Sequence, residues 1–245
     1  MLKYSGVCID SVGELIEFLK THLAGTNSPA WFRGQSKATW SLVPKLLREG
    51  VERSESYLIT KFKQNATLLL PHPPTCDFEW LYLMQHYSWP TRLLDWSESP
   101  LVALYFAVEE NDEDDGSLWV LLPTLLNEKS NYRPDYSLEI PSFEDEHLRN
   151  YLPETVMSEH RSRLFPIAAL APRNSPRMQS QQGAFTISHR ENTAIEDVGE
   201  PDALRDHVWK YAIPRGAKAS IREELRILGI TRFQLFPELE NLTSI

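Results

Sequence analysis

The chain has 245 residues, a formal net charge of −9, 42% hydrophobic residues and 24% charged residues. This is the composition of a globular protein, and it excludes an intrinsically disordered chain. The acidic balance argues against a surface for extended nucleic acid, which needs clustered Lys and Arg, while leaving room for a local basic pocket.

The sequence predicts a soluble, cytoplasmic protein with no membrane partner. It contains no run of about 18 apolar residues, and the N-terminus lacks the apolar stretch of a secretory signal. Cys8 and Cys76 are too few for a disulfide framework, and the histidines show no metal-ligand spacing. We therefore assign no metal site.

Helix signals dominate the first half of the chain. Ser11 and Glu14 have the S-x-x-E spacing of a capping box, and Ser99 with Pro100 suits the start of another helix. Helices are predicted at residues 11–25, 54–70, 78–87 and 99–108, a short strand at 29–35, and an extended or looped segment at 91–97.

The second half is richer in strands. Strands are predicted at residues 117–122, 166–171, 183–188 and 207–213, followed by an amphipathic helix at 217–228 and a tail whose aromatic residues dock on the core. Residues 126–165 are polar and interrupted by prolines, which favours an insertion or a lid. The whole pattern, residues 1–245, predicts a single α+β domain with a mixed or antiparallel β core flanked by helices.

Three segments place polar groups among apolar neighbours. In the first, Arg33 must pair with a carboxylate or present its guanidinium to a ligand, and Gly34 allows a ligand or another backbone to approach closely. In the third, Gln181 and Gln182 precede a small-residue strand, and such amides can read a carbonyl or a base edge.

The second segment, residues 85–97, joins a helix end to a helix start, where free N–H groups favour anions. Its polar residues are Gln85, His86, Ser88, Thr91, Arg92, Asp95 and Ser97. A purely structural alternative is an Arg92–Asp95 ion pair that locks the turn, with His86 as a hydrogen-bonding group at a helix end.

Taken together, Trp31–Gln35, the block from Gln85 to Ala107, and Gln181-x-Gly183-x-Phe185 resemble the FRG-domain family, named for its Phe-Arg-Gly element. The tail, with its Leu235-Phe236-Pro237 segment, is also similar, so that the resemblance spans about residues 11–242 and leaves 126–165 poorly matched. The run from Pro90 to Trp96 is the most distinctive piece, and Ser97 stands where the family more often has Thr. The family occurs in bacteria and phages, which is compatible with a toxin or defence role.

A weaker similarity links the chain to ADP-ribosyltransferases, which have an Arg or His followed by Gly on an early strand and a Ser-x-Ser element before a helix. Arg33-Gly34 and Ser97-Glu98-Ser99 fit these features. Such enzymes also carry a late Glu, which here is replaced by Gln181 and Gln182, so that Asp95 is our candidate for the missing charge.

This similarity implies an NAD- or nucleotide-binding pocket, with NAD as a substrate and no cofactor assigned. Arg33, Asp95 and Gln181 are the predicted catalytic residues, with Arg33 clamping a phosphate and Ser97 orienting the ribose. The predicted ligand-binding residues are Gly34, Gln35, Gln85, His86, Thr91, Arg92, Ser97, Gly183 and Phe185.

Two other functions fit the same residues. A non-catalytic module would bind a nucleotide, a single-stranded nucleic acid or a partner protein, with Trp31, Tyr87, Trp89 and Trp96 as stacking surfaces. A hydrolase would use His86 as base and Asp95 as its orienting group, although no G-x-S-x-G nucleophile element is present.

Overall fold

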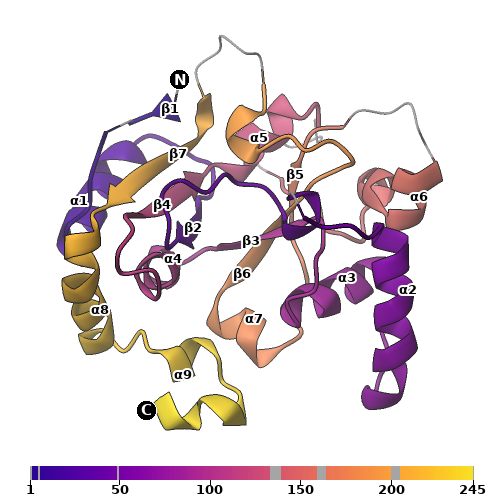
Figure 1. The fold of residues 1–245 in the computed structure, drawn as a ribbon. Helices are drawn as coiled ribbons and strands as arrows, with labels where there is room; N and C mark the ends of the chain where they lie inside the picture. Colours follow the sequence, from indigo (N-terminus) through magenta and orange to yellow (C-terminus); the bar gives the residue numbers. More distant parts are fainter. Residues whose placement is uncertain are drawn as a thin grey trace.

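The computed structural model describes residues 2–4, 6–48, 50–132, 139–158, 164–199 and 205–244. They form one seven-stranded mixed sheet with the strand order β1-β7-β4-β2-β3-β6-β5, flanked by helices (Figure 1). The β1–β7 pair is parallel and the other named pairs are antiparallel. The predicted α+β class is confirmed.

The strands are β1 (Leu2–Lys3), β2 (Trp31–Gln35), β3 (Leu93–Ser97), β4 (Gly116–Leu121), β5 (Ile167–Ala169), β6 (Gly183–Ile187) and β7 (Arg205–Ile213). The α-helices are α1 (Val12–His22), α2 (Glu55–Ala66), α3 (Asp77–His86), α4 (Pro100–Val108), α5 (Pro123–Lys129), α6 (Pro153–Ser158), α7 (Pro176–Ser180), α8 (Lys218–Ile227) and α9 (Arg232–Leu235). Short 3-10 turns include η1 (Lys45–Leu47), η2 (Thr67–Leu69), η3 (Glu146–Tyr151) and η6 (Leu239–Ser244).

Side-chain caps start the predicted helices where the sequence indicates. The Ser11 hydroxyl accepts the N–H of Glu14 at the start of α1, and the Ser99 hydroxyl accepts the N–H of Val102 at the start of α4. The Glu14 carboxylate accepts the N–H of Asp10 at 2.8 Å, one residue before the position that the capping box predicts.

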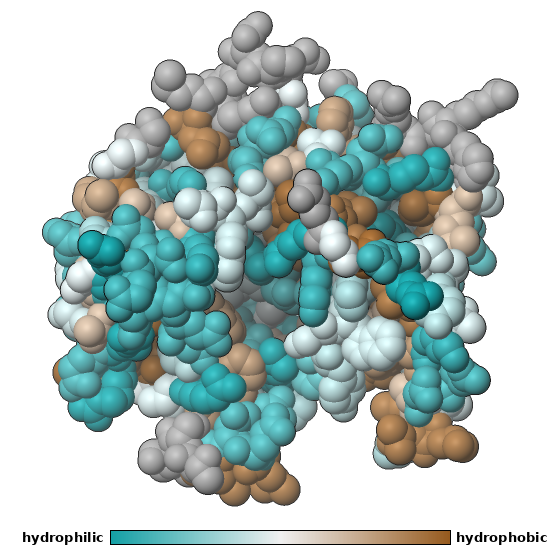
Figure 2. Space-filling model, viewed as in Figure 1, coloured by the Kyte–Doolittle hydropathy of each residue, from teal (hydrophilic) through white to brown (hydrophobic). Residues whose placement is uncertain are grey.

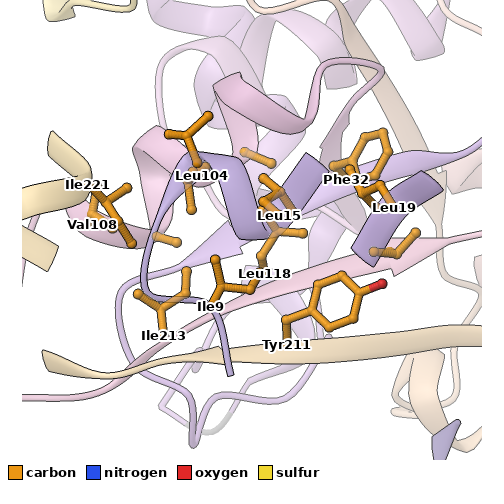
Figure 3. Packing of buried hydrophobic residues seen from close by; sticks show 14 of the residues in the cluster. Ile9, Leu15, Leu19, Phe32, Leu104, Val108, Leu118, Tyr211, Ile213 and Ile221 are labelled. Atoms are coloured by element: carbon orange, nitrogen blue, oxygen red, sulfur yellow. The ribbon is translucent and has the colours of Figure 1, made fainter. Parts of the chain in front are cut away.

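Helices cover one face of the sheet in two separate groups. On β2, β4 and β7, α1, α4 and α8 bury a cluster that includes Leu15, Phe32, Leu118 and Ile221 (Figure 3). On β3, β5 and β6, α2 and α3 bury a second cluster. The division between these groups falls at the β2–β3 junction, in the middle of the sheet (Figure 1).

Gly34 lies where the backbones of β2 and α4 approach each other closely. A Cβ built on Gly34 would lie 1.8 Å from the carbonyl oxygen of Ala103 and 2.5 Å from the backbone nitrogen of Ala107. Both atoms belong to the backbone of α4 and cannot rotate away. Of the two predicted roles of Gly34, close approach of another backbone is therefore what the structure shows.

We expect Gly34→Ala to lower the free energy of unfolding by about 3 kcal/mol or more, because α4 must move away from β2. Urea denaturation followed by tryptophan fluorescence measures this. Gly13→Ala is the matched control, since the nearest atom to its added Cβ is Ser11 Oγ at 3.8 Å. Equal stability of the two variants would contradict the packing argument.

Residues 126–165, which the sequence predicts to be an insertion or a lid, contain several buried side chains. Leu126, Phe143, Leu148 and Tyr151 are each at most 5% exposed, and α5 packs against β5 and β7. Short helices such as α5 span too few turns to show a periodic apolar pattern, which is why the sequence does not give their bounds. Residues 133–138 and 159–163 of this region lie outside the described residues.

Among the helices of the described ranges, none has both the length and the apolar character needed to cross a membrane.

Candidate functional site

A cleft of about 960 Å³ opens on the helix-covered face of the sheet. It lies where the two helical groups separate, over β3, and it corresponds to the hollow in the middle of the face in Figure 2. Its walls come from β2, β3, β6, α3, α4 and α7. Elements far apart in the sequence therefore converge on one site.

Asp95 presents a carboxylate in this cleft. It lies at the centre of β3, opposite Phe185 of β6, and 54% of its side chain is exposed. Its Oδ2 accepts a hydrogen bond from Gln85 Nε2 at 2.6 Å and lies 3.9 Å from Arg33 Nη1. In the described residues, no hydrogen bond is made to Oδ1.

Arg33 donates a hydrogen bond across the place where β2 and β3 separate. The β2–β3 ladder has a single register pair, Phe32 with Ser97. Beyond it Arg33 Nη1 donates to the Asp95 carbonyl oxygen at 2.6 Å, which supplies the partner that a continuing ladder would have provided. Arg33 Nε is buried and has no hydrogen-bond partner in the part of the chain that the structure describes. The only hydrogen bond of the Arg33 guanidinium to the described residues comes from Nη1, so Nη2 keeps donor capacity for a ligand in the cleft that Arg33 lines.

Arg48 adds a second positive charge, and sequence reasoning missed it. The side chain follows η1, donates from Nε to the Val43 carbonyl at 3.0 Å, and lines the cleft. Partial burial lowers the pKa of Arg48, and burial with a smaller opposing effect of Asp95 lowers that of Arg33. Both guanidiniums remain cationic near neutral pH. The sequence around Arg48 has no apolar pattern that would have marked it.

The other cleft carboxylates differ from Asp95. Glu79 accepts the N–H groups of Thr75 and Cys76 at the start of α3. Glu109 accepts from Tyr105 Oη and pairs with Arg232. Glu110 is exposed at the rim. Asp95 is thus the cleft acid that combines a central position with a carboxylate oxygen open to a ligand.

The segment from Gln181 to Phe185 forms another wall of the cleft, and its polar groups have hydrogen-bond partners within the protein. Ser97 Oγ donates to the Gln181 carbonyl at 2.7 Å, and Gln181 Nε2 donates to the Leu235 carbonyl at 3.1 Å. Gly183 lines the cleft and pairs with Ser97, while Phe185 stacks on Tyr82 with ring centroids 5.4 Å apart. The predicted catalytic amide of Gln181 thus anchors the C-terminal segment.

Gln35 and His86, two of the predicted ligand-binding residues, line the cleft. Gln35 is 3% exposed, and its Oε1 accepts the indole N–H of Trp119 at 2.8 Å, so it also fixes the core. Burial, reinforced by nearby Arg177, lowers the pKa of His86, which favours a neutral imidazole at neutral pH. Arg177 Nη1 also donates to the His86 carbonyl at 3.3 Å.

Arg92 lies away from the cleft, and the predicted Arg92–Asp95 pair is wrong. Arg92 is 2% exposed; its Nε donates to both Glu55 carboxylate oxygens at 2.9 Å, and its Nη atoms donate to the carbonyls of Ser188 and Tyr151. Side chains three positions apart in an extended segment project to opposite sides, which separates Arg92 from Asp95.

Thr91 is fully buried and does not line the cleft, so the structure gives it no direct contact with a ligand there. Its hydroxyl donates to Gln85 Oε1 instead.

The remaining predicted site residues, from Arg33 through Asp95 to Gln181, all line the same cleft. In the described ranges, no group of three or more His, Cys, Asp or Glu side chains is arranged to hold a metal ion.

Residues 28–116 match the family model of the FRG domain. This part of the chain is an FRG domain. The match runs from just before β2 to the start of β4, and includes Arg33, Arg48, Gln85 and Asp95. It is narrower than the predicted 11–242, and the cleft wall formed by α7 and β6 lies outside it. No curated protein and no solved structure matches the chain.

Proposed function

We propose that the cleft of this FRG-domain protein binds an NAD-like dinucleotide and that Asp95 promotes cleavage of its nicotinamide–ribose bond. The observation that supports it most is the half-exposed Asp95 carboxylate near two guanidiniums, which places an acid for chemistry close to two positive charges for an anionic ligand. The protein as a whole is strongly acidic, so two guanidiniums that line one cleft are a specific feature of this place.

Different side chains of the cleft suit different parts of such a ligand. Arg33 and Arg48 suit the pyrophosphate, because guanidinium groups bind phosphate oxygens through paired, charge-assisted hydrogen bonds. Trp40 and Tyr87, which line the cleft and are 46% and 59% exposed, offer ring faces for a base. A volume of about 960 Å³ lies at the upper end of the range for small-molecule sites and accommodates a dinucleotide.

In the proposed reaction the bond between ribose C1′ and the nicotinamide nitrogen breaks, and its electron pair leaves with nicotinamide. The Asp95 carboxylate stabilises the positive charge that develops at C1′. The oxygen of water or of an acceptor hydroxyl then forms the new bond to C1′ and loses its proton to solvent. With water the products are ADP-ribose, nicotinamide and one proton, so atoms and charge balance.

The test combines calorimetric titration with ADP-ribose and chromatographic detection of nicotinamide released from NAD. We expect saturable binding by the wild type, and a loss of about 10- to 100-fold in affinity for Arg33→Met, since one charge-assisted phosphate contact disappears. Arg149→Met is the matched control, because Arg149 is an exposed arginine paired with Glu146 outside the cleft.

Three results are informative. Binding with nicotinamide release supports the enzyme. Binding of ADP-ribose without release of nicotinamide favours the second candidate, a non-catalytic nucleotide-binding module, which the engaged Gln181 amide also suits. Absence of binding by the folded wild type would overturn the proposal.

A further inference from the structure

We propose that Thr91 and Gln85 act together as a positioning relay that fixes the Asp95 carboxylate, and that neither acts as a ligand-binding residue in its own right. The inference rests on the proposed function, because it assigns these two residues a part in the reaction of Asp95. Its geometric half can be tested without any activity.

The relay consists of three consecutive hydrogen bonds. The Leu93 N–H donates to Thr91 Oγ1 at 3.2 Å, Thr91 Oγ1 donates to Gln85 Oε1, and Gln85 Nε2 donates to Asp95 Oδ2 at 2.6 Å. The chain of contacts begins at the backbone of β3, passes through the last turn of α3, and returns to β3 two residues farther along.

The donor and acceptor properties of these groups fix the direction of the relay. An ionised carboxylate only accepts hydrogen bonds, so the amide group that faces Asp95 must be the NH2. The Gln85 carbonyl then faces Thr91, whose hydroxyl donates to it while accepting the N–H of Leu93. A flipped amide would set its carbonyl oxygen against the carboxylate, which is repulsive.

Burial makes the first member of the relay rigid. Thr91 is 0% exposed, so water does not compete for its hydroxyl, and its χ1 angle is restricted because the side chain is β-branched. The neighbouring backbone is fixed as well, since the Thr91 carbonyl accepts the N–H of Leu46 at 3.1 Å. A rigid hydroxyl orients the Gln85 amide, and the amide holds one carboxylate oxygen.

The consequence concerns the other carboxylate oxygen. With Oδ2 occupied by Gln85 and the Asp95 backbone carbonyl occupied by Arg33, rotation of the carboxylate is restricted, and Oδ1 keeps a fixed direction in the cleft. Oδ1 is then the atom that stabilises the charge at C1′. Loss of the relay should slow the chemical step and leave the binding of phosphates by Arg33 and Arg48 in place.

The test uses Thr91→Val, which keeps the shape and removes the hydroxyl, and Thr91→Ser, which keeps the hydroxyl. The matched control is Thr186→Val, because Thr186 is equally buried but accepts from Trp96 Nε1 on the opposite face. Urea denaturation confirms that each variant is folded.

The structural readout is the side-chain amide of Gln85 in ¹⁵N NMR spectra, assigned by its loss in Gln85→Glu. In the wild type we expect a downfield NH2 proton with slow solvent exchange. Thr91→Val should shift it and speed exchange, whereas Thr91→Ser and Thr186→Val should not. An unchanged Gln85 signal in Thr91→Val would refute the relay, whether or not the protein turns over NAD.

The kinetic readout is nicotinamide release. We expect Thr91→Val to reduce kcat about tenfold with ADP-ribose affinity within about twofold of the wild type, and Thr91→Ser to restore kcat. If the NMR signal responds and kcat does not, the contact exists but has no positioning role, and the inference fails. If the wild type releases no nicotinamide, the proposed enzymatic function fails and with it the positioning role, while the NMR result still decides whether the hydrogen-bonded relay exists.

Discussion

Asp95→Asn should reduce nicotinamide release by about 10²- to 10³-fold, because a neutral amide cannot stabilise the positive charge at C1′ as a carboxylate does. Asn has nearly the same shape as Asp, so β3 should keep its pairing with β6. The measurement is the steady-state rate of nicotinamide production from NAD, with folding checked by circular dichroism.

Binding should respond in the opposite direction. Removing one negative charge near Arg33 and Arg48 makes the cleft more positive, and the affinity for ADP-ribose should stay equal or rise. Glu110→Gln is the matched control, since Glu110 lines the same cleft but lies exposed at its rim. A wild-type rate in Asp95→Asn would exclude Asp95 as the charged group. An equal fall in both variants would point to a general effect of cleft charge.

Arg92→Met should be the most destabilising of the substitutions considered outside the cleft. It leaves the buried Glu55 carboxylate without its partner and removes donors from the Ser188 and Tyr151 carbonyls. Breaking a buried pair in this way costs about 3–5 kcal/mol in the free energy of unfolding. The surface pair of Arg149 and Glu146, with 71% and 83% of the side chains exposed, provides the control: Arg149→Met should change stability by less than about 0.5 kcal/mol.

The loss in Arg92→Met should depend on pH. Burial already raises the pKa of Glu55 in the folded protein, although Arg92 opposes that effect, so the pKa should rise further in the variant. A raised folded-state pKa means that the folded state binds more protons than the unfolded state. Stability therefore falls as pH rises through this window, and Arg92→Met should be less destabilised at about pH 5 than at about pH 7.5.

Urea denaturation at both pH values, with wild type and Arg149→Met in parallel, measures this difference. A loss of stability that is the same at both pH values would show that the carboxylate of Glu55 is not the cause, and would leave the two carbonyl groups as the source of the effect.

Local chemistry determined much of the fold. The caps at Ser11 and Ser99 and the apolar periodicity after them predicted α1 and α4, because capping and amphipathic spacing act within one or two helical turns. The strand at β4 was predicted from its continuous apolar run. The burial of side chains in the region from 126 to 165 was not predicted, because these residues contact partners that are distant in the sequence.

The sequence also determined which segments hold the candidate site. Polar residues embedded in apolar surroundings marked β2, the α3–β3 junction and the α7–β6 turn, and these three do line one cleft. Such residues stand out without a structure because burying them is costly unless something compensates.

Tertiary structure alone decided the role of each residue within those segments. Arg92 and Arg33 both stand among apolar residues in the sequence. In the structure Arg92 pairs with the buried Glu55 carboxylate. Arg33 lines the cleft, and its Nε has no hydrogen-bond partner among the described residues. Thr91, a predicted ligand contact, is buried and donates to Gln85, and Arg48 lines the cleft although no sequence signal marked it. A side chain's partners depend on where strands separate and how helices pack, and no local pattern of residues records that geometry.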